Sequence, residues 1–196
     1  MRAVVTGAAG ALGRAVVDAF AKAGWDVRGL SRQDADLLDP AAVQASLDPL
    51  GAIDALVCCA GGYSEGRMDD LEPAEFRRLF DLNVMTAFHA IRAALPLMKG
   101  GGAIVTVSSR AAAAGEPGLA AYTASKSALI RLTETVGAEN PGIRCNVILP
   151  GNIDTPQNRA DMPGADPSGW TAPAKIAGVV LFLCTDDTIR GASIPV

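Results

Sequence analysis

A tyrosine and a lysine stand four residues apart in the segment Tyr122-Thr123-Ala124-Ser125-Lys126. On a helix this spacing places both side chains on one face, one turn apart. A free tyrosine has a pKa of about 10, so it is a poor acid or base at neutral pH. A neighbouring ammonium group favours the phenolate and lowers that pKa. We therefore expect Tyr122 to exchange a proton and Lys126 to tune it, although such a pair by itself is more often a solvated helix face.

A serine follows the apolar run that precedes this pair. Ser109 ends the segment Ile104-Val105-Thr106-Val107-Ser108-Ser109, which has the composition of a buried strand. Open α/β sheets bind ligands at the carboxyl ends of their strands. The Ser109 hydroxyl could therefore donate to a substrate carbonyl oxygen and stabilise developing negative charge. Without Tyr122 nearby, a serine that simply ends a strand would be the better interpretation.

A glycine-rich loop near the N-terminus predicts a phosphate site. Gly7 would allow a tight turn, Gly10 a close approach of the backbone to pyrophosphate, and Gly13 close packing of helix on sheet. The start of the following helix presents free N–H groups and a partial positive charge. The alternative is a small-residue turn with no ligand, but the position between a strand and a helix favours a dinucleotide. The residues predicted to line this site are Gly7, Ala9, Gly10, Ala11, Leu12 and Gly13.

The end of the second predicted strand indicates which dinucleotide binds. An acidic residue there accepts the ribose hydroxyls of NAD, whereas an arginine accommodates the 2′-phosphate of NADP. This chain has Ser31 and Arg32 at that point, which favours NADP(H) and leaves NAD(H) possible. Asp34 is close enough to weaken the preference, and an exposed arginine without a cofactor role is the alternative. Asp36 and Leu37 are placed to contact the adenine edge.

Short apolar runs alternate with longer helical patterns along the chain, which predicts a parallel sheet covered by helices on both faces. Such a doubly wound α/β domain would bring the carboxyl ends of the strands together. The expected strands are Arg2–Val5, Asp26–Leu30, Ile53–Ala60, Ala103–Val107 and Ile143–Leu149. The expected helices are Ala11–Ala23, Pro40–Leu47, Pro73–Met98, Leu119–Ala138 and Pro173–Thr185.

Length and composition restrict the class of protein. The 196 residues suit one domain, and 49% hydrophobic residues can fill a core. A net charge of −4 argues against a nucleic-acid partner, and no apolar run approaches the roughly 18 residues of a membrane span. The N-terminus enters a strand directly, without a signal peptide, so we expect a cytoplasmic protein. The four cysteines lack metal spacing and His89 is the single histidine, so no metal site is expected.

The long irregular stretch Pro150–Trp170 is rich in proline, glycine, asparagine and aspartate. Loops of this length are usually functional, so we expect residues 151–170 to form a short lid over a substrate. Tyr63, beside Gly62, and Trp170 lie on loops at the expected substrate mouth, where an aromatic surface could stack on a flat ring. Simple packing of the lid is the alternative for both aromatic residues.

Taken together, these residues resemble the short-chain dehydrogenase/reductase family. The segments that carry the resemblance are the Thr6–Gly13 loop, Cys58-Cys59-Ala60-Gly61, Asn83, Ser109, Tyr122 with Lys126, Pro150–Thr155 and Gly191–Val196. The separation of 13 between Ser109 and Tyr122 is usual for that family. Two cysteines stand where the family has two asparagines before Ala60-Gly61.

The resemblance implies a Rossmann fold and hydride transfer between NAD(P)H and a carbonyl, imine or alcohol. It implies that Tyr122 is the acid or base, Lys126 its tuner, Ser109 the group that orients the carbonyl, and Asn83 part of a proton-relay site. It adds to the cofactor-binding residues Cys59, Ala60, Gly61, Tyr122, Lys126, Pro150, Gly151, Ile153 and Thr155.

A narrower resemblance links Gly7–Gly13, Ala60–Tyr63 and Ile153–Arg159 to dihydropteridine reductases. That branch reduces quinonoid dihydropterin with NADH and lacks the catalytic serine, whereas this chain has Ser109 and Arg32. A pterin reductase is therefore one alternative function. A cofactor-sensing protein without catalysis is a second, against which the complete set of catalytic residues argues. A scaffold that merely dimerises is a third, against which the glycine loop argues.

The segments Pro73–Met98 and Leu119–Ala138 predict a homo-oligomer, a dimer rather than a tetramer. Apolar residues surround more than one face of the first segment, which calls for a second partner. They are Phe80, Val84, Phe88 and Ile91 at helical spacing, with Leu79, Leu82 and Leu95 beside them. The family pairs the same helices about a two-fold axis. Coverage by neighbouring helices of one chain is the alternative.

Overall fold

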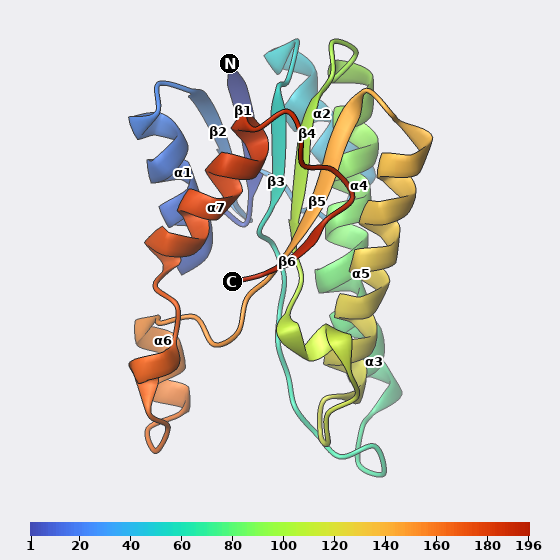
Figure 1. Ribbon diagram of the computed structural model, residues 1–196. Coiled ribbons are helices and arrows are strands. Elements are labelled where there is room, and N and C mark those ends of the chain that lie inside the picture. The colour runs from blue at the N-terminus through green and yellow to red at the C-terminus, as the bar shows by residue number, and fades with distance from the viewer.

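The computed structural model describes residues 1–196 and contains one six-stranded sheet. All neighbouring strands pair in parallel, in the order β2-β1-β3-β4-β5-β6 (Figure 1). The chain adds β2 on one side of β1 and all later strands on the other, so the sheet has a crevice where β1 meets β3. The strands are β1 (Arg2–Thr6), β2 (Asp26–Leu30), β3 (Ala55–Cys58), β4 (Gly102–Val107), β5 (Ile143–Leu149) and β6 (Ser193–Pro195).

Helices cover both faces of the sheet, so the predicted doubly wound fold class is confirmed (Figure 1). On one face lie α1 (Ala11–Lys22) and α7 (Pro173–Thr185), and their core includes Phe20 in edge-on contact with Trp25. On the other lie α2 (Pro40–Leu47), α4 (Thr86–Ala94) and α5 (Ala120–Glu139). β1, β3 and β4 alternate side chains between the two cores, which is why these strands are mostly apolar.

The predicted single helix Pro73–Met98 is divided into several helical segments. It consists of α3 (Pro73–Phe80), a π-helical turn (Asp81–Met85), α4 and a 3-10 turn (Leu95–Leu97) that contains Pro96. The π turn surrounds Asn83, whose buried side chain bonds outside its own helix. Such bulges commonly mark functional sites. The sequence of the turn does not predict it, because the hydrogen bonds that hold Asn83 there come from Gly62 and Ser125, which are distant in the sequence.

The stretch 151–170 is more regular than expected. It contains α6 (Pro156–Asp161) and a 3-10 turn (Pro167–Gly169), and Ile153 forms an isolated parallel bridge with Thr171. The Thr155 hydroxyl caps α6 by accepting from the Asn158 N–H at 3.0 Å, and Pro156 occupies the first turn. These are ordinary helix-start signals that the sequence contains. α6 lies beyond the carboxyl ends of the strands, on the side of α1 and α7 (Figure 1). None of the helices has the length and apolar character that crossing a membrane requires.

Candidate active site

The glycine loop connects β1 to α1 through contacts that only glycine allows. Gly7 has φ +67°, and a Cβ there would lie 2.6 Å from the Ala60 nitrogen. A Cβ on Gly13 would lie 2.1 Å from the Gly7 carbonyl oxygen. α1 begins after Gly10 without a side-chain cap, so its first N–H groups have no partner from a capping side chain. The loop thus brings bare backbone and the positive end of a helix to the crevice.

A cavity of about 1030 Å³ occupies this crevice. Its walls come from the glycine loop, the segment after β2 and the segment after β3. The predicted cofactor residues that line it are Gly7, Ala9, Gly10, Ser31, Arg32, Asp36, Leu37, Cys59, Ala60 and Gly61. The other members of the predicted loop, Ala11, Leu12 and Gly13, form the first turn of α1. The predicted residues Pro150, Gly151, Ile153 and Thr155 lie outside the cavity wall, on the connection from β5 to α6.

The sequence interpretation missed part of this wall. The additional lining residues are Arg14, Leu30, Gln33, Leu38, Leu82 and Thr86. Arg14 follows the glycine loop directly, and this position in the sequence could have identified it as a lining residue. Leu82 and Thr86 come from the π turn and α4, so only the packing of that helix against the sheet reveals them.

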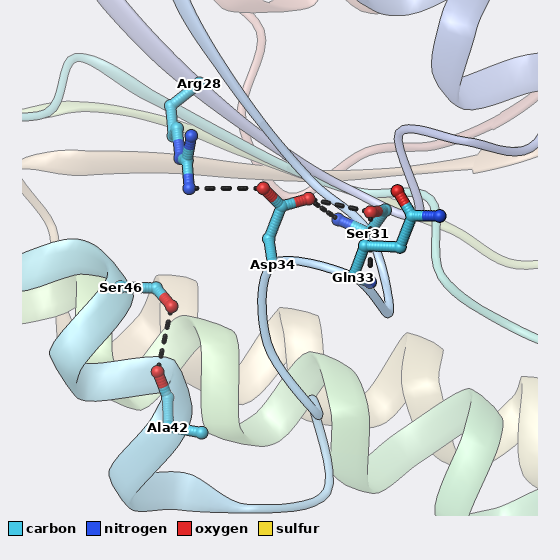
Figure 2. A network of polar contacts seen from close by, with 6 residues as sticks. All are labelled: Arg28, Ser31, Gln33, Asp34, Ala42 and Ser46. Atoms are coloured by element: carbon cyan, nitrogen blue, oxygen red, sulfur yellow. Dashed lines mark hydrogen bonds and ion pairs between the residues drawn. The ribbon is translucent and has the colours of Figure 1, made fainter.

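The end of β2 carries a compact polar network that involves Asp34 (Figure 2). The Asp34 carboxylate accepts from the Ser31 hydroxyl at 2.7 Å and from the Ser31 N–H at 2.9 Å, and it pairs with Arg28 at 3.3 Å. The Ser31 hydrogen bonds, followed by the Arg28 charge, lower the pKa of Asp34. Asp34 is engaged in this turn and does not line the cavity, whereas Arg32 does.

Lys126 and Asn83 stand behind the Gly61 end of the cavity. A Cβ on Gly61 would lie 2.8 Å from Asn83 Oδ1 and 3.2 Å from Lys126 Nζ. Lys126 is 6% exposed, and its ammonium donates to the Val107 carbonyl oxygen at 2.9 Å. The Asn83 amide donates to the Gly62 carbonyl oxygen at 3.1 Å and to the Ser125 hydroxyl at 2.9 Å. Asn83 Oδ1 accepts from the Gly62 N–H at 2.8 Å.

Tyr122 adjoins the same cluster. Ser109 is near enough to its phenol to oppose the rise of its pKa, and Lys126 Nζ lies 5.9 Å from the centre of its ring. The Ser125 hydroxyl donates to the Tyr122 carbonyl oxygen at 2.8 Å, which links the turn of α5 that carries Tyr122 to Asn83. The fold therefore brings the four predicted catalytic residues together from two elements, the π turn and α5, and from the loop after β4.

The ionisation of this pair differs from the expectation that Lys126 lowers the Tyr122 pKa. Burial raises the pKa of Tyr122 above its ordinary value of 10, and the Ser109 hydroxyl acts in the opposite direction. Burial lowers the pKa of Lys126 to about 8. The physical reason is that loss of water disfavours both the phenolate and the ammonium ion. Burial likewise raises the pKa of Cys59 to about 12, which keeps this cavity-lining thiol protonated.

Tyr63, which the sequence predicts at the substrate mouth, lies beside Tyr122. Its ring meets the Tyr122 ring edge-on, with centroids 5.0 Å apart, and its hydroxyl donates to Glu65 at 3.0 Å. Tyr63 is 56% exposed, so much of its side chain is accessible to solvent. Gly62 is adjacent and bonded to Asn83. Trp170 is half-buried beside the 3-10 turn of the 151–170 stretch and is paired with neither tyrosine ring.

Known proteins similar to this chain are dehydrogenases and reductases. A family model described as enoyl-(acyl carrier protein) reductase matches residues 39–196. The 2-(R)-hydroxypropyl-CoM dehydrogenase of Xanthobacter autotrophicus is 37% identical over 79% of this chain and 69% of its own length. The 2,3-dihydro-2,3-dihydroxybenzoate dehydrogenase of Escherichia coli is 34% identical over 93% of this chain and 88% of its own. A solved structure described as a short chain dehydrogenase/reductase family protein has 31% identity and a TM-score of 0.91 over 100% of this chain and 95% of its own.

Proposed function

Because the chain belongs to the short-chain dehydrogenase/reductase family of oxidoreductases, we propose that it transfers hydride between NADP(H) and a small carbonyl or alcohol substrate. One observation carries the proposal. The buried cluster of Asn83 and Lys126 directly backs the cavity at Gly61, and Tyr122 with Ser109 adjoins it. A dinucleotide in the cavity would therefore end where these polar groups converge.

The cavity suits a dinucleotide. The glycine loop leaves no room for side chains where phosphate would approach, and the start of α1 offers N–H groups there. The bound nicotinamide would supply or accept the hydride. The preference for NADP(H) is supported by Arg32 and Arg14 in the cavity wall, and the carboxylate of Asp34, outside that wall, is held by Ser31 and Arg28. Asp36 also lines the wall and would face the adenosine half.

Each residue of the cluster has a role in this proposal. Tyr122 holds a proton at its phenol oxygen at neutral pH and would give it to the substrate oxygen when a carbonyl is reduced. Ser109 would donate to the same oxygen and stabilise its charge. Lys126 would hold the ribose of the cofactor from the buried side, and Asn83 would fix the loop at Gly62 and take part in proton relay.

The proposal also assigns residues to contact with the substrate. Tyr63 would contact the substrate through its exposed side chain, and residues 151–170 would cover the substrate from the side of α6.

The proposed dimer would use apolar residues that recur at helical spacing. Phe88 on α4 is 36% exposed, and Phe80 and Val84, eight and four residues earlier, are half-buried. Leu79 and Ile91 are already buried within the chain and Leu82 lines the cavity, so Phe88, Phe80, Val84 and Leu95 are the predicted apolar residues left for a dimer contact. The four cysteines are free, as a reducing cytoplasm would keep them.

The proposed function is tested by following oxidation of NADPH and of NADH with a panel of ketones, quinones and quinonoid dihydropterin. We expect turnover of at least one ketone with NADPH. Preferred turnover of quinonoid dihydropterin with NADH would instead support the pterin reductase. Binding of nucleotide without turnover of any member of the panel would contradict the enzymatic proposal.

A further inference from the structure

We propose that His89 is a positioning residue for the adenosine half of the nucleotide site, because its ring holds the cavity-lining segment 36–38 through the Leu37 carbonyl. The inference rests on the proposed function, since it assumes that a nucleotide occupies the cavity. His89 lies on α4 and is not one of the predicted catalytic residues.

The segment between β2 and α2 contains no helix or strand, yet it forms much of one cavity wall. Its lining residues are Ser31, Arg32, Gln33, Asp36, Leu37 and Leu38. Its own side-chain hydrogen bonds are local: Asp34 bonds Ser31 and Arg28 (Figure 2), and Asp36 accepts from the Leu38 N–H at 2.9 Å. Local bonds of this kind shape the turns but do not set the distance of the segment from the rest of the cavity.

The bond from His89 supplies a polar connection of this kind, beside the packing of the Leu37 side chain on the core. His89 Nδ1 lies 2.9 Å from the Leu37 carbonyl oxygen, across 52 positions of sequence. It is the one side-chain hydrogen bond that joins residues 31–39 to an element other than β2 and α2. A carbonyl oxygen can only accept, so the Nδ1 atom must carry the hydrogen. His89 is 9% exposed, which leaves little water to replace this donor if it is lost.

The same helix also reaches the cavity directly. Thr86 lies one turn before His89 on α4 and lines the cavity, as does Leu82 one turn earlier. Residues three and four apart share a helix face. α4 and the π turn before it therefore form a wall of the site, and α4 holds the adjoining wall at Leu37 through His89. Movement of the 36–38 segment would change the adenosine end and leave the Tyr122 end in place.

Replacement of His89 by leucine removes the donor and leaves the Leu37 carbonyl without its partner. We expect the dissociation constant of NADPH to rise roughly 3- to 10-fold, as for one lost hydrogen bond. The KM for NADPH rises in parallel, and kcat at saturating NADPH stays within about twofold. His89→Asn places an amide N–H close to the Nδ1 position and restores most of the affinity. Arg92→Ala, an exposed change one turn later on α4, is the matched control and binds as the unmutated protein does.

The experiment measures binding of NADPH, and of adenosine 2′,5′-bisphosphate as a probe of the adenosine half, by calorimetry on folded protein whose melting temperature is recorded. Equal weakening of both ligands in His89→Leu, with recovery in His89→Asn, supports the inference. Unchanged affinity in His89→Leu, or weakening of NADPH without weakening of the bisphosphate, overturns it while the proposed function stands. If His89→Leu does not fold, His89→Asn and His89→Gln decide, because only the first keeps the donor at Nδ1. An unmutated protein that binds neither NADPH nor NADH overturns the proposed function and this inference with it.

Discussion

The ammonium nitrogen of Lys126 donates to the Val107 carbonyl oxygen over 2.9 Å, at the point where β4 ends. This bond holds the lysine side chain at the carboxyl end of the strand, and Nζ lies 5.9 Å from the centre of the Tyr122 ring. Burial at this place, more than the charge of either partner, decides how the two groups ionise. Tyr122 consequently remains a phenol at neutral pH, whereas Lys126 titrates near pH 8.

Replacement of Tyr122 by phenylalanine should abolish turnover and leave nucleotide binding intact. The change removes only the phenol oxygen that we place at the substrate oxygen, and a general acid contributes roughly 10²- to 10⁴-fold to the rate. Steady-state assays with the best substrate of the panel measure the loss, and fluorescence titration with NADPH is the control for binding. Near-normal turnover in the variant would remove Tyr122 from the mechanism.

The unmutated protein should use NADPH in preference to NADH, and Arg32→Ala should narrow the difference. A hydrogen bond to a charged group contributes roughly 1.5–3 kcal/mol, which corresponds to a preference of about ten- to a hundredfold. The measurement is kcat/KM for both nucleotides in both proteins. Arg131→Ala, on the exposed surface of α5, is the control and keeps the preference. An equal or higher kcat/KM with NADH in the unmutated protein contradicts the assignment.

The stability difference between Lys126→Met and the unmutated protein should depend on pH. Burial lowers the Lys126 pKa from 10.5 to about 8, so between these values the unfolded chain binds a proton that the folded protein does not. The unmutated protein therefore gains stability relative to the variant as pH rises through this window, by about 1.4 kcal/mol per pH unit. Below pH 8 both states carry the proton and the difference is constant.

Urea unfolding of both proteins at pH 7, 8.5 and 9.5 measures this difference. Only the difference between the two proteins is informative, because cysteines and tyrosines titrate in the same range. The charges of Cys59 and Lys126 influence each other, but burial raises the pKa of Cys59 to about 12, so its thiol stays protonated in the folded protein across these pH values. A difference in the free energy of unfolding that does not change across this range would show that Lys126 is not desolvated.

Replacement of Gly61 by alanine should damage both stability and turnover. The new Cβ would lie 2.8 Å from Asn83 Oδ1, which is held by the Gly62 N–H and cannot withdraw freely. Overpacking of this kind costs roughly 1–3 kcal/mol. Gly66→Ala is the matched control in the same loop, because its Cβ would meet nothing within 4 Å. Thermal melts and activity assays compare the two variants, and equal behaviour of both would rule out the close packing at Gly61.

The protein should be a dimer that Phe88→Lys converts to a monomer. Phe88 is the most exposed apolar residue of α4, and a buried lysine in its place would have to lose its hydration. Phe182→Lys is the control, because Phe182 is 52% exposed on α7, on the opposite face of the sheet. Sedimentation at micromolar concentration measures the mass. A mass near 20.0 kDa for the unmutated protein contradicts the dimer.

Local pattern alone determined the fold class and the parts of the site that depend on one segment. The predicted bounds of β2, α2, β5 and α7 coincide with the structure, because apolar periodicity and proline at helix starts act within each element. The pairing of Tyr122 with Lys126 follows from helix geometry, and the glycine loop follows from backbone sterics.

Tertiary structure alone decided the features that join distant segments. Nothing local in the sequence shows that Asp34 pairs with Arg28, that His89 bonds the Leu37 carbonyl, or that Ser125 bonds Asn83. The place of Thr86 in the cavity wall is equally hidden in the sequence. The direction of the Tyr122 pKa shift was mispredicted for the same reason. Burial is a property of the whole packed chain, and its effect on a charge can exceed that of a neighbour four residues away.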